Sequence, residues 1–279
     1  MPKVGFIGAG RVGSAAAYTL LLLMDLDEIA LVDVLEDLAG GEALDLIHAS
    51  YALNKLTKIS GGSDYQLLNG SDLIIVSAGA ARKPGMSRLD LLQKNARIID
   101  QVAEKLREIY DGGVVIVVTN PVDLMTYIFW RKSGLPRSKV IGMGGVLDTS
   151  RLWSLIGRRS DDMVLGEHGD SMFIRGRHEA LEEKLRGLAM EVIRRKGATI
   201  FGPAASIYKL AKAILTDSKQ ILPVSAVLEG EYGLENVAIG VPARIGKDGI
   251  LEIIEFEDVR EKLRRSAHAL RERLREIGH

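Results

Sequence analysis

The chain has 279 residues, of which 47% are apolar, and its 37 Lys and Arg residues balance 37 Asp and Glu residues. This length predicts one large domain or two modest ones, and the lack of a basic excess argues against nucleic acid as a partner. The sequence contains no cysteine, which excludes disulfides, cysteine-ligated zinc and thiol nucleophiles. The many charged residues and the excess of Arg over Lys are also typical of a thermophile.

No segment predicts secretion or a membrane span. The longest apolar run, Ala15–Met24, is too short to cross a bilayer. Residues 1–4 lead directly into a strand-like segment and lack the pattern of a signal peptide. We therefore expect a soluble, cytoplasmic protein with no membrane partner.

Strands and helices are expected to alternate through the first half of the chain. The expected strands are Lys3–Ile7, Glu28–Asp33, Leu73–Val76, Val114–Val118 and Val140–Gly142. Several are continuous β-branched runs, as in parallel strands that helices cover on both faces. Helices are expected after the first strand and over about residues 35–51, so the pattern predicts βαβ units.

The second half has a different pattern. Helices are expected over about residues 146–156 and 179–196, from about Pro203, and at the end of the chain. Strand-like segments lie at about residues 221–228, 237–241 and 250–254. The sequence thus predicts an α/β fold: a doubly wound parallel sheet over residues 1–144, followed by an α+β domain over residues 145–279.

A glycine-rich turn joins the first strand to the first helix. Its residues are Gly8, Ala9, Gly10, Arg11, Val12 and Gly13. Gly8 allows a tight turn, Gly10 lets a pyrophosphate approach the backbone, and Gly13 lets the helix pack on the strand. Asp33, 20 residues past the last glycine, can accept hydrogen bonds from an adenosine ribose.

This context predicts a Rossmann-type domain that binds NAD. A carboxylate at the end of the second strand would repel a 2′-phosphate, so NADP is possible but less favoured. Two alternatives stay open, namely a glycine-rich turn of another α/β protein and a site for a different ligand that contains adenosine.

Three further segments carry polar groups at the ends of strands or on a helix face. The loop Ala80–Arg88 contains three cations without acidic partners, which suggests anion binding, and Ser87 is expected to cap the next helix. The alternative is a solvated charged loop. Asn120 precedes Pro121, which is expected at the first position of a helix.

Asp148 and Arg151 are three residues apart on an expected helix and so share one face, although an ordinary surface salt bridge would look the same. His168 lies between two glycines in a turn that follows the short apolar run Met163–Leu165. Its side chain can give or take a proton near neutral pH, although a surface turn could also contain a histidine. No set of His, Asp and Glu residues has the spacing of a metal site.

Together these motifs resemble the lactate/malate dehydrogenase family, through most of the chain. The matching segments are Gly8–Gly13, Asp33, Ala81–Arg88, Asn95, Val118–Pro121, Leu147–Arg151 and Gly166–Asp170. Lys196–Pro203 looks like the archaeal-type malate dehydrogenases of this family. The resemblance implies an NAD-binding domain, a substrate domain, homo-dimers or homo-tetramers and a place in the tricarboxylic acid cycle.

The resemblance also implies the roles of individual residues. His168 would be the catalytic proton donor and acceptor, and Asp148 its partner. Arg151 would bind the C1 carboxylate of the substrate, Arg88 would polarise its carbonyl, and Asn120 would contact both substrate and nicotinamide. The implied cofactor-binding residues are Gly8, Gly10, Arg11, Val12, Gly13, Asp33, Gly79, Asn95, Val118, Thr119 and Asn120.

Arg82 is implied as the residue that distinguishes the substrates, because malate enzymes of the family carry Arg where lactate enzymes carry Gln. Oxaloacetate has a second carboxylate that a closed, dry site must neutralise. The sequence therefore predicts an NAD-dependent malate dehydrogenase that acts on a small dicarboxylate. The alternatives are a lactate or other 2-hydroxy-acid dehydrogenase and a catalytically silent NAD-binding homologue.

The chain also departs from the family pattern. It has fewer residues than usual between Leu152 and Leu165, and again after Phe173. The sequence therefore predicts a shortened substrate domain around an otherwise complete set of catalytic residues.

Overall fold

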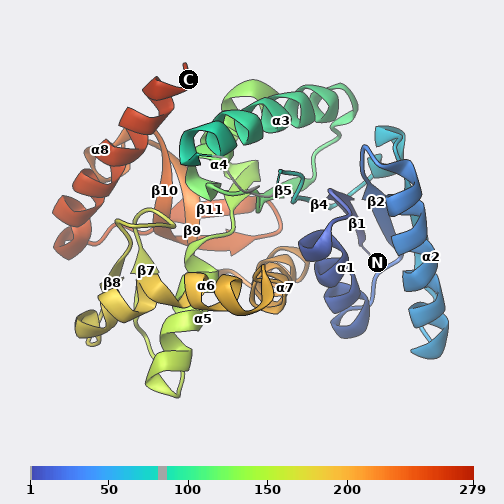
Figure 1. Ribbon diagram of the computed structural model, residues 1–279, viewed down its shortest axis with the longest axis horizontal. Helices are drawn as coiled ribbons and strands as arrows, with labels where there is room; N and C mark the ends of the chain where they lie inside the picture. The colour runs from blue at the N-terminus through green and yellow to red at the C-terminus, as the bar shows by residue number, and fades with distance from the viewer. Residues whose placement is uncertain (1, 81–86) are drawn as a thin grey trace.

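The computed structural model describes residues 2–80 and 87–279, and these residues are built around one large mixed sheet. Within them, nine strands lie in the order β11-β10-β9-β6-β5-β4-β1-β2-β3 (Figure 1). Their bounds are β1 Lys3–Ile7, β2 Glu28–Val32, β3 Lys58–Gly62, β4 Leu73–Val76, β5 Val114–Val117, β6 Val140–Gly142, β9 Gln220–Glu229, β10 Glu235–Gly246 and β11 Gly249–Ile253.

The strands β1–β6 pair in parallel, and their order is that of a doubly wound fold, as the sequence predicted. β4 and β5 have no polar residue because helices cover both of their faces. Strands β9–β11 from the second half continue the same sheet in antiparallel fashion, with Gly142 opposite Ser225. The predicted boundary between residues 144 and 145 falls at the start of α5, and the division into two domains stays a prediction.

The described residues form eight α-helices, and all but one of them pack on the large sheet. Their bounds are α1 Arg11–Leu23, α2 Glu36–Ala52, α3 Arg88–Ile109, α4 Val122–Ser133, α5 Gly145–Ile156, α6 Glu182–Lys196, α7 Phe201–Leu215 and α8 Arg260–Glu276. One face of the sheet packs on α3, α4 and α8, and buries residues such as Ile99 and Leu270. The other face packs on α1, α2, α5 and α7 (Figure 1). It buries Leu20 and Ile207. Two cores therefore fix the sheet between its helices.

Short 3-10 helices complete the connections, at η1 Tyr65–Leu68, η2 Arg137–Lys139, η3 Glu179–Leu181, η4 Glu231–Gly233 and η5 Glu257–Val259. A separate hairpin is formed by β7 (Met163–Leu165) and β8 (Phe173–Arg175). It is attached to the large sheet by a bridge between Gly166 and Gly240 in β10. The remaining helix, α6, packs on this hairpin and on α5. The turn of this hairpin carries His168, so its attachment fixes the position of the histidine.

Most of the expected elements are present, with differences at three places. β3 was not expected, because its sequence Lys-Ile-Ser-Gly-Gly has little strand character and forms only through pairing at the edge of the sheet. β10 runs through Pro242 and is longer than the expected 237–241. Pro121 lies just before α4 instead of at its first position, and follows a cis peptide bond. Ser87 caps α3 through a capping box with Asp90, which confirms the predicted cap.

Candidate active site

The turn that carries His168 is held by three different elements of the fold. The consecutive backbone N–H groups of residues 166–168 donate to Gly240 O in β10 (2.9 Å), Ser266 Oγ in α8 (2.8 Å) and Asp123 Oδ2 in α4 (2.7 Å). A turn of this kind would otherwise leave its donors to water. The backbone of His168 is therefore fixed before its side chain makes any contact.

The imidazole of His168 is bonded to a buried carboxylate on α5. Its Nδ1 lies 2.5 Å from Oδ2 of Asp148, and Oδ1 of the same carboxylate accepts a hydrogen bond from Arg151 Nη1 (2.9 Å). Asp148 is only 1% exposed, so this is not the ordinary surface salt bridge that its spacing also allowed. Because Nδ1 is bonded to Asp148, Nε2 is the ring nitrogen that can exchange a proton with a ligand.

The environment of His168 favours its charged form. Burial alone would lower the pKa of its imidazole, but the charge and the hydrogen bond of Asp148 and the charge of Asp123 outweigh burial and the opposing charge of Arg151. The pKa of His168 is therefore raised above its usual value. A raised pKa suits a group that must hold a proton until a carbonyl oxygen needs it.

Asp123 is a buried carboxylate that the sequence reasoning missed. Burial raises its pKa to about 6, against the hydrogen bond from the backbone N–H of His168 and the charge of its imidazole. Its Oδ1 has no hydrogen-bond partner among the described residues. No pattern in the sequence connects Asp123 with His168, 45 residues further on, because the contact depends on how α4 meets the hairpin.

The glycine-rich turn has the geometry that a dinucleotide needs. Gly8 adopts a φ of +104°, and a Cβ on Gly13 would lie 2.0 Å from Gly8 O. No atom of residues 2–80 and 87–279 lies within 4 Å of the place where a Cβ on Gly10 would be, so this part of the structure leaves its outer side open. α1 begins at Arg11, and Val12 is its second residue. No side chain caps this end of the helix, and its first turn contains no acidic residue. Its N-terminal N–H groups are therefore available to an anion.

A cavity of about 630 Å³ lies beside this turn, and its lining includes Gly8, Asp33, Tyr65, Gly79 and Lys105. The carboxylate of Asp33 accepts a hydrogen bond from the backbone N–H of residue 9 (2.8 Å), which ties it to the turn. Burial, and then the charge of Asp33, raise the pKa of Tyr65 to about 12. The size of the cavity and its carboxylate fit the adenosine end of NAD.

The remaining predicted cofactor residues lie together past the ends of β4 and β5. Asn95 Nδ2 donates to Asn120 O (2.8 Å), and a Cβ on Gly79 would lie 2.7 Å from Thr119 Cγ2. Val118 follows β5 directly and is largely buried. These residues lie at the carboxyl edge of the parallel strands, where ligands bind in such folds.

Two predicted substrate residues cannot be described in the same way. Arg82 lies outside the described residues, as does most of the cationic loop. Arg88 is the first residue of α3, and only its backbone is described. Their predicted roles stay predictions.

Comparison with known families decides what this arrangement is. Residues 2–142 match the NAD-binding domain of lactate/malate dehydrogenase, and residues 175–279 match the α/β C-terminal domain of the same family. The chain belongs to the lactate/malate dehydrogenase family. The predicted fold and family are thereby confirmed, and so is NAD as the cofactor of this dehydrogenase.

Several relatives are similar over the whole chain. A malate dehydrogenase of Archaeoglobus fulgidus is 53% identical over 293 residues, covering 99% of this chain and 100% of the relative. The structure of malate dehydrogenase from that organism in complex with NADH matches with a TM-score of 0.94, 53% identity, and 99% and 100% coverage. L-lactate dehydrogenase 2 of Bacillus cereus is 36% identical over 299 residues, covering 96% of this chain and 95% of the relative.

The chain is shorter than the Archaeoglobus fulgidus relative, and the location of the missing residues on either side of the His168 turn stays a prediction. The first alignment spans 293 positions against a chain of 279 residues, so at least 14 of its positions have no counterpart here. The high TM-score shows that the shorter chain keeps the fold.

His178 is half-buried, and its Nδ1 lies 2.9 Å from Oδ2 of the buried Asp162. Asp162 Oδ1 also accepts the backbone N–H of residues 177 and 178, with the second bond at 3.3 Å. These contacts join the chain just before β7 to the chain just after β8. They close the open end of the hairpin, opposite the turn that carries His168.

Within residues 2–80 and 87–279, no group of three His, Asp or Glu side chains is arranged to hold a metal ion. Over the same residues, no helix combines the length and the apolar character that crossing a bilayer would require.

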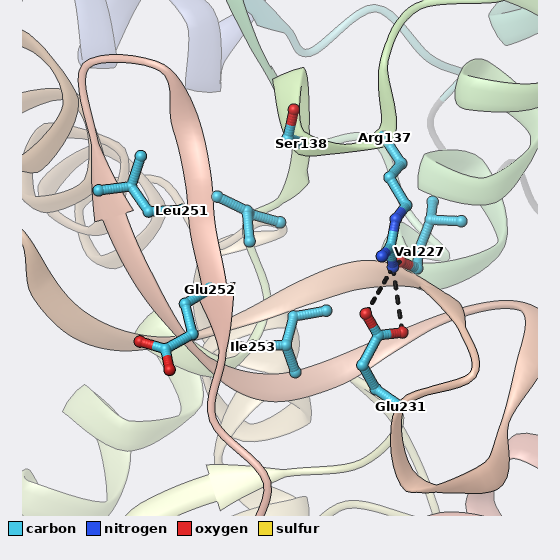
Figure 2. A pocket seen from close by; sticks show the side chains of 8 residues that line it. Arg137, Ser138, Val227, Glu231, Leu251, Glu252 and Ile253 are labelled. Carbon is cyan, nitrogen blue, oxygen red and sulfur yellow. Dashed lines mark hydrogen bonds and ion pairs between the residues drawn. The ribbon is translucent and has the colours of Figure 1, made fainter.

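A second cavity, of about 190 Å³, lies at the opposite edge of the parallel strands, beside the start of β6 (Figure 2). Figure 2 shows Arg137 above this cavity, with its guanidinium directed at Glu231 (2.8 Å). Arg137 Nε also lies 3.1 Å from a carboxylate oxygen of Glu229. Two carboxylates neutralise the arginine, so this cavity offers no free cation to an anionic ligand.

Proposed function

We propose that the protein catalyses the reversible oxidation of (S)-malate to oxaloacetate with NAD. The observation that carries this proposal is the set formed by His168, Asp148 and Arg151, since it combines a proton donor with a carboxylate-binding cation. These three residues lie in a chain whose family has an N-terminal NAD-binding domain. Full-length relatives named malate dehydrogenase support the choice of substrate.

The residues of the chain act in the following way. Arg151 keeps one Nη1 bond to Asp148 and has further N–H groups with which it binds the C1 carboxylate of malate. Neutral His168 takes the hydroxyl proton at Nε2 during oxidation, and protonated His168 returns it to the carbonyl oxygen during reduction. Asp148 holds Nδ1–H and stabilises the imidazolium. Bound NAD supplies the group that accepts hydride from C2 of malate or returns it to oxaloacetate.

Three further residues orient the reactants. Asn120 contacts the substrate and the nicotinamide side of the site. Arg88 polarises the carbonyl, and Arg82 pairs with the distal carboxylate of oxaloacetate. Arginines at these positions raise the rate by stabilising negative charge in a site from which water is excluded.

Exchange of Arg82 for Gln tests the choice of substrate. We expect Arg82→Gln to lower kcat/KM for oxaloacetate strongly and to leave or raise kcat/KM for pyruvate, because only oxaloacetate has a second carboxylate. Arg82→Lys, which keeps the charge, should retain the preference in part. An unchanged ratio of the two substrates would show that Arg82 does not recognise the distal carboxylate.

Lactate oxidation is the second candidate, because relatives named lactate dehydrogenase match the chain at 36% identity. A silent NAD-binding homologue is the third, and NADH binding without any NADH oxidation would favour it. The retention of His168, Asp148 and Arg151 in bonded contact supports an active enzyme.

We also propose a homo-oligomer, a dimer or a tetramer, in the cytoplasm. The outer face of α1 and α2 exposes large apolar side chains, namely Tyr18, Leu22, Leu44 and Tyr51. A groove of about 310 Å³ lies between the two helices. A second copy of the chain that covers this face would remove the apolar area from water. Light scattering after size-exclusion chromatography tests this, and Tyr51→Glu should shift an oligomer toward monomer.

A further inference from the structure

A buried carboxylate lies next to the catalytic histidine in the chain, and the proposed mechanism does not use it. Glu167 is only 4% exposed. Its Oε2 accepts a hydrogen bond from the hydroxyl of Ser171 (2.6 Å), and its Oε1 forms an ion pair with Nη1 of Arg273. A buried anion needs such a partner, because desolvation of an unpaired charge is costly.

Arg273 lies on α8, 106 residues beyond Glu167. The same helix holds the backbone of Glu167, since Ser266 Oγ accepts its N–H and lies 2.8 Å from the hydroxyl of Ser171. Ser266 and Arg273 are seven residues apart, so they share one face of the helix. α8 is anchored in the core by Leu263 and Leu270, and it therefore holds the residue before His168 from a rigid support.

We propose that Arg273 is a positioning residue for His168. From α8 it neutralises and anchors Glu167, and so fixes both the place of the catalytic imidazole and the electrostatic field around it. This inference rests on the proposed role of His168 in proton transfer.

The charges around His168 explain why the pairing matters. The imidazole faces Asp148 and Arg151 on α5 and Asp123 on α4, and its neighbour in the turn is Glu167. The charge of Glu167 already contributes to the raised pKa of Asp123, so it acts inside this cluster. Without Arg273 the described part of the cluster would hold three carboxylates, those of Asp123, Asp148 and Glu167, and one arginine, Arg151, besides the histidine. The imidazolium would then be over-stabilised, and the turn would lose its link to α8.

The test uses four variants of the full chain and measures NADH oxidation with oxaloacetate, NADH binding, and the titration of the His168 imidazole by NMR. Arg273→Met keeps an apolar stem but removes the charge. We expect kcat to fall by about 10- to 100-fold, as for other losses of orientation around a catalytic group, with unchanged NADH binding. The imidazole of His168 should titrate at higher pH, and Arg273→Lys should restore most of both properties.

The double variant Glu167→Gln with Arg273→Met separates the effect of an unpaired charge near His168 from the effect of losing the contact between the turn and α8. It removes the buried charge of Glu167 together with the charge of its partly exposed partner, so no unpaired buried charge remains, and the variant is informative even where the single variant fails to fold. We expect a lowered kcat with the His168 titration at its wild-type position. Arg265→Met is the matched control, because Arg265 lies on the exposed side of α8, where it pairs with Glu261. It should behave like the wild type.

Several results would overturn the inference. One is a folded Arg273→Met variant with wild-type kcat and wild-type titration of His168. A fall in kcat without any shift of the titration would leave Arg273 with a structural role only. A double variant with wild-type kcat, or an equal loss in Arg265→Met, would also contradict it. The NMR titration needs no turnover, so a wild-type enzyme that fails to reduce oxaloacetate would refute the proposed function without deciding this inference.

Discussion

Replacement of Asp148 by Asn tests the link between geometry and chemistry at the active site. The carboxylate of Asp148 is buried and lies 2.5 Å from Nδ1 of His168, so its charge acts at full strength on the imidazole. A nearby charge of opposite sign stabilises the protonated form of an imidazole and so raises its pKa. Asp148→Asn should therefore lower the pKa of His168.

The effect depends on the direction of the reaction. Above neutral pH the fraction of protonated His168 should fall, and the rate of oxaloacetate reduction should fall with it. Lower pH should restore part of this loss, whereas malate oxidation, which begins with neutral His168, should lose less. NADH absorbance recorded over a range of pH in both directions measures these rates.

Asp148→Asn should also change how the stability of the folded protein depends on pH. The folded pKa of His168 is raised, so this group stabilises the protein below its unfolded pKa, and the stabilisation is lost as the pH rises through the folded pKa. Asp148→Asn should remove that part of the pH dependence. If the pH profile of oxaloacetate reduction does not move in this variant, the explanation of the raised pKa by Asp148 is wrong.

Three other changes have defined outcomes. The new Cβ of Gly10→Ala would have no described atom within 4 Å, so the stability of this variant should be close to that of the control Gly187→Ala. The same Cβ would contact the pyrophosphate, so calorimetry should show NADH binding weakened by at least about tenfold. Asp123→Asn should raise the free energy of unfolding in urea by up to ~3 kcal/mol above about pH 6. The raised pKa of Asp123 favours its protonated form, so ionisation of this group costs stability as the pH rises from about 4 to 6. Equal gains at pH 4 and pH 8 would contradict this. Gly176→Ala would place a Cβ 1.9 Å from Oδ1 of Asp162 at a φ of +146°, so we expect a lower melting temperature, and an unchanged one would refute the role of this contact.

The parallel half of the fold was predictable because its signals are local. The β-branched runs of β4 and β5 and the glycine-rich turn each report their structure within a few residues. β3 was missed, because its five residues form a strand only when β2 supplies a partner. The sequence also gave no sign that β9–β11 would extend the same sheet, since pairing between distant segments leaves no periodicity.

The residues of the active site also divide into those that the sequence predicts and those that only the packing of the fold identifies. The pairing of Asp148 with His168 was expected from the family resemblance, and the structure brings the two side chains into contact. The groups that hold the backbone of the turn, such as Asp123 and Ser266, come from helices 45 and 99 residues away. Their residue types are common in helices, so only the packing of α4 and α8 against the hairpin identifies them.

Measurement of kcat/KM of the purified protein with NADH, for oxaloacetate and for pyruvate side by side, tests the proposed malate dehydrogenase activity most directly. We expect rapid oxidation of NADH with oxaloacetate and much slower oxidation with pyruvate. Faster turnover of pyruvate, or binding of NADH without oxidation by either substrate, would contradict this proposal.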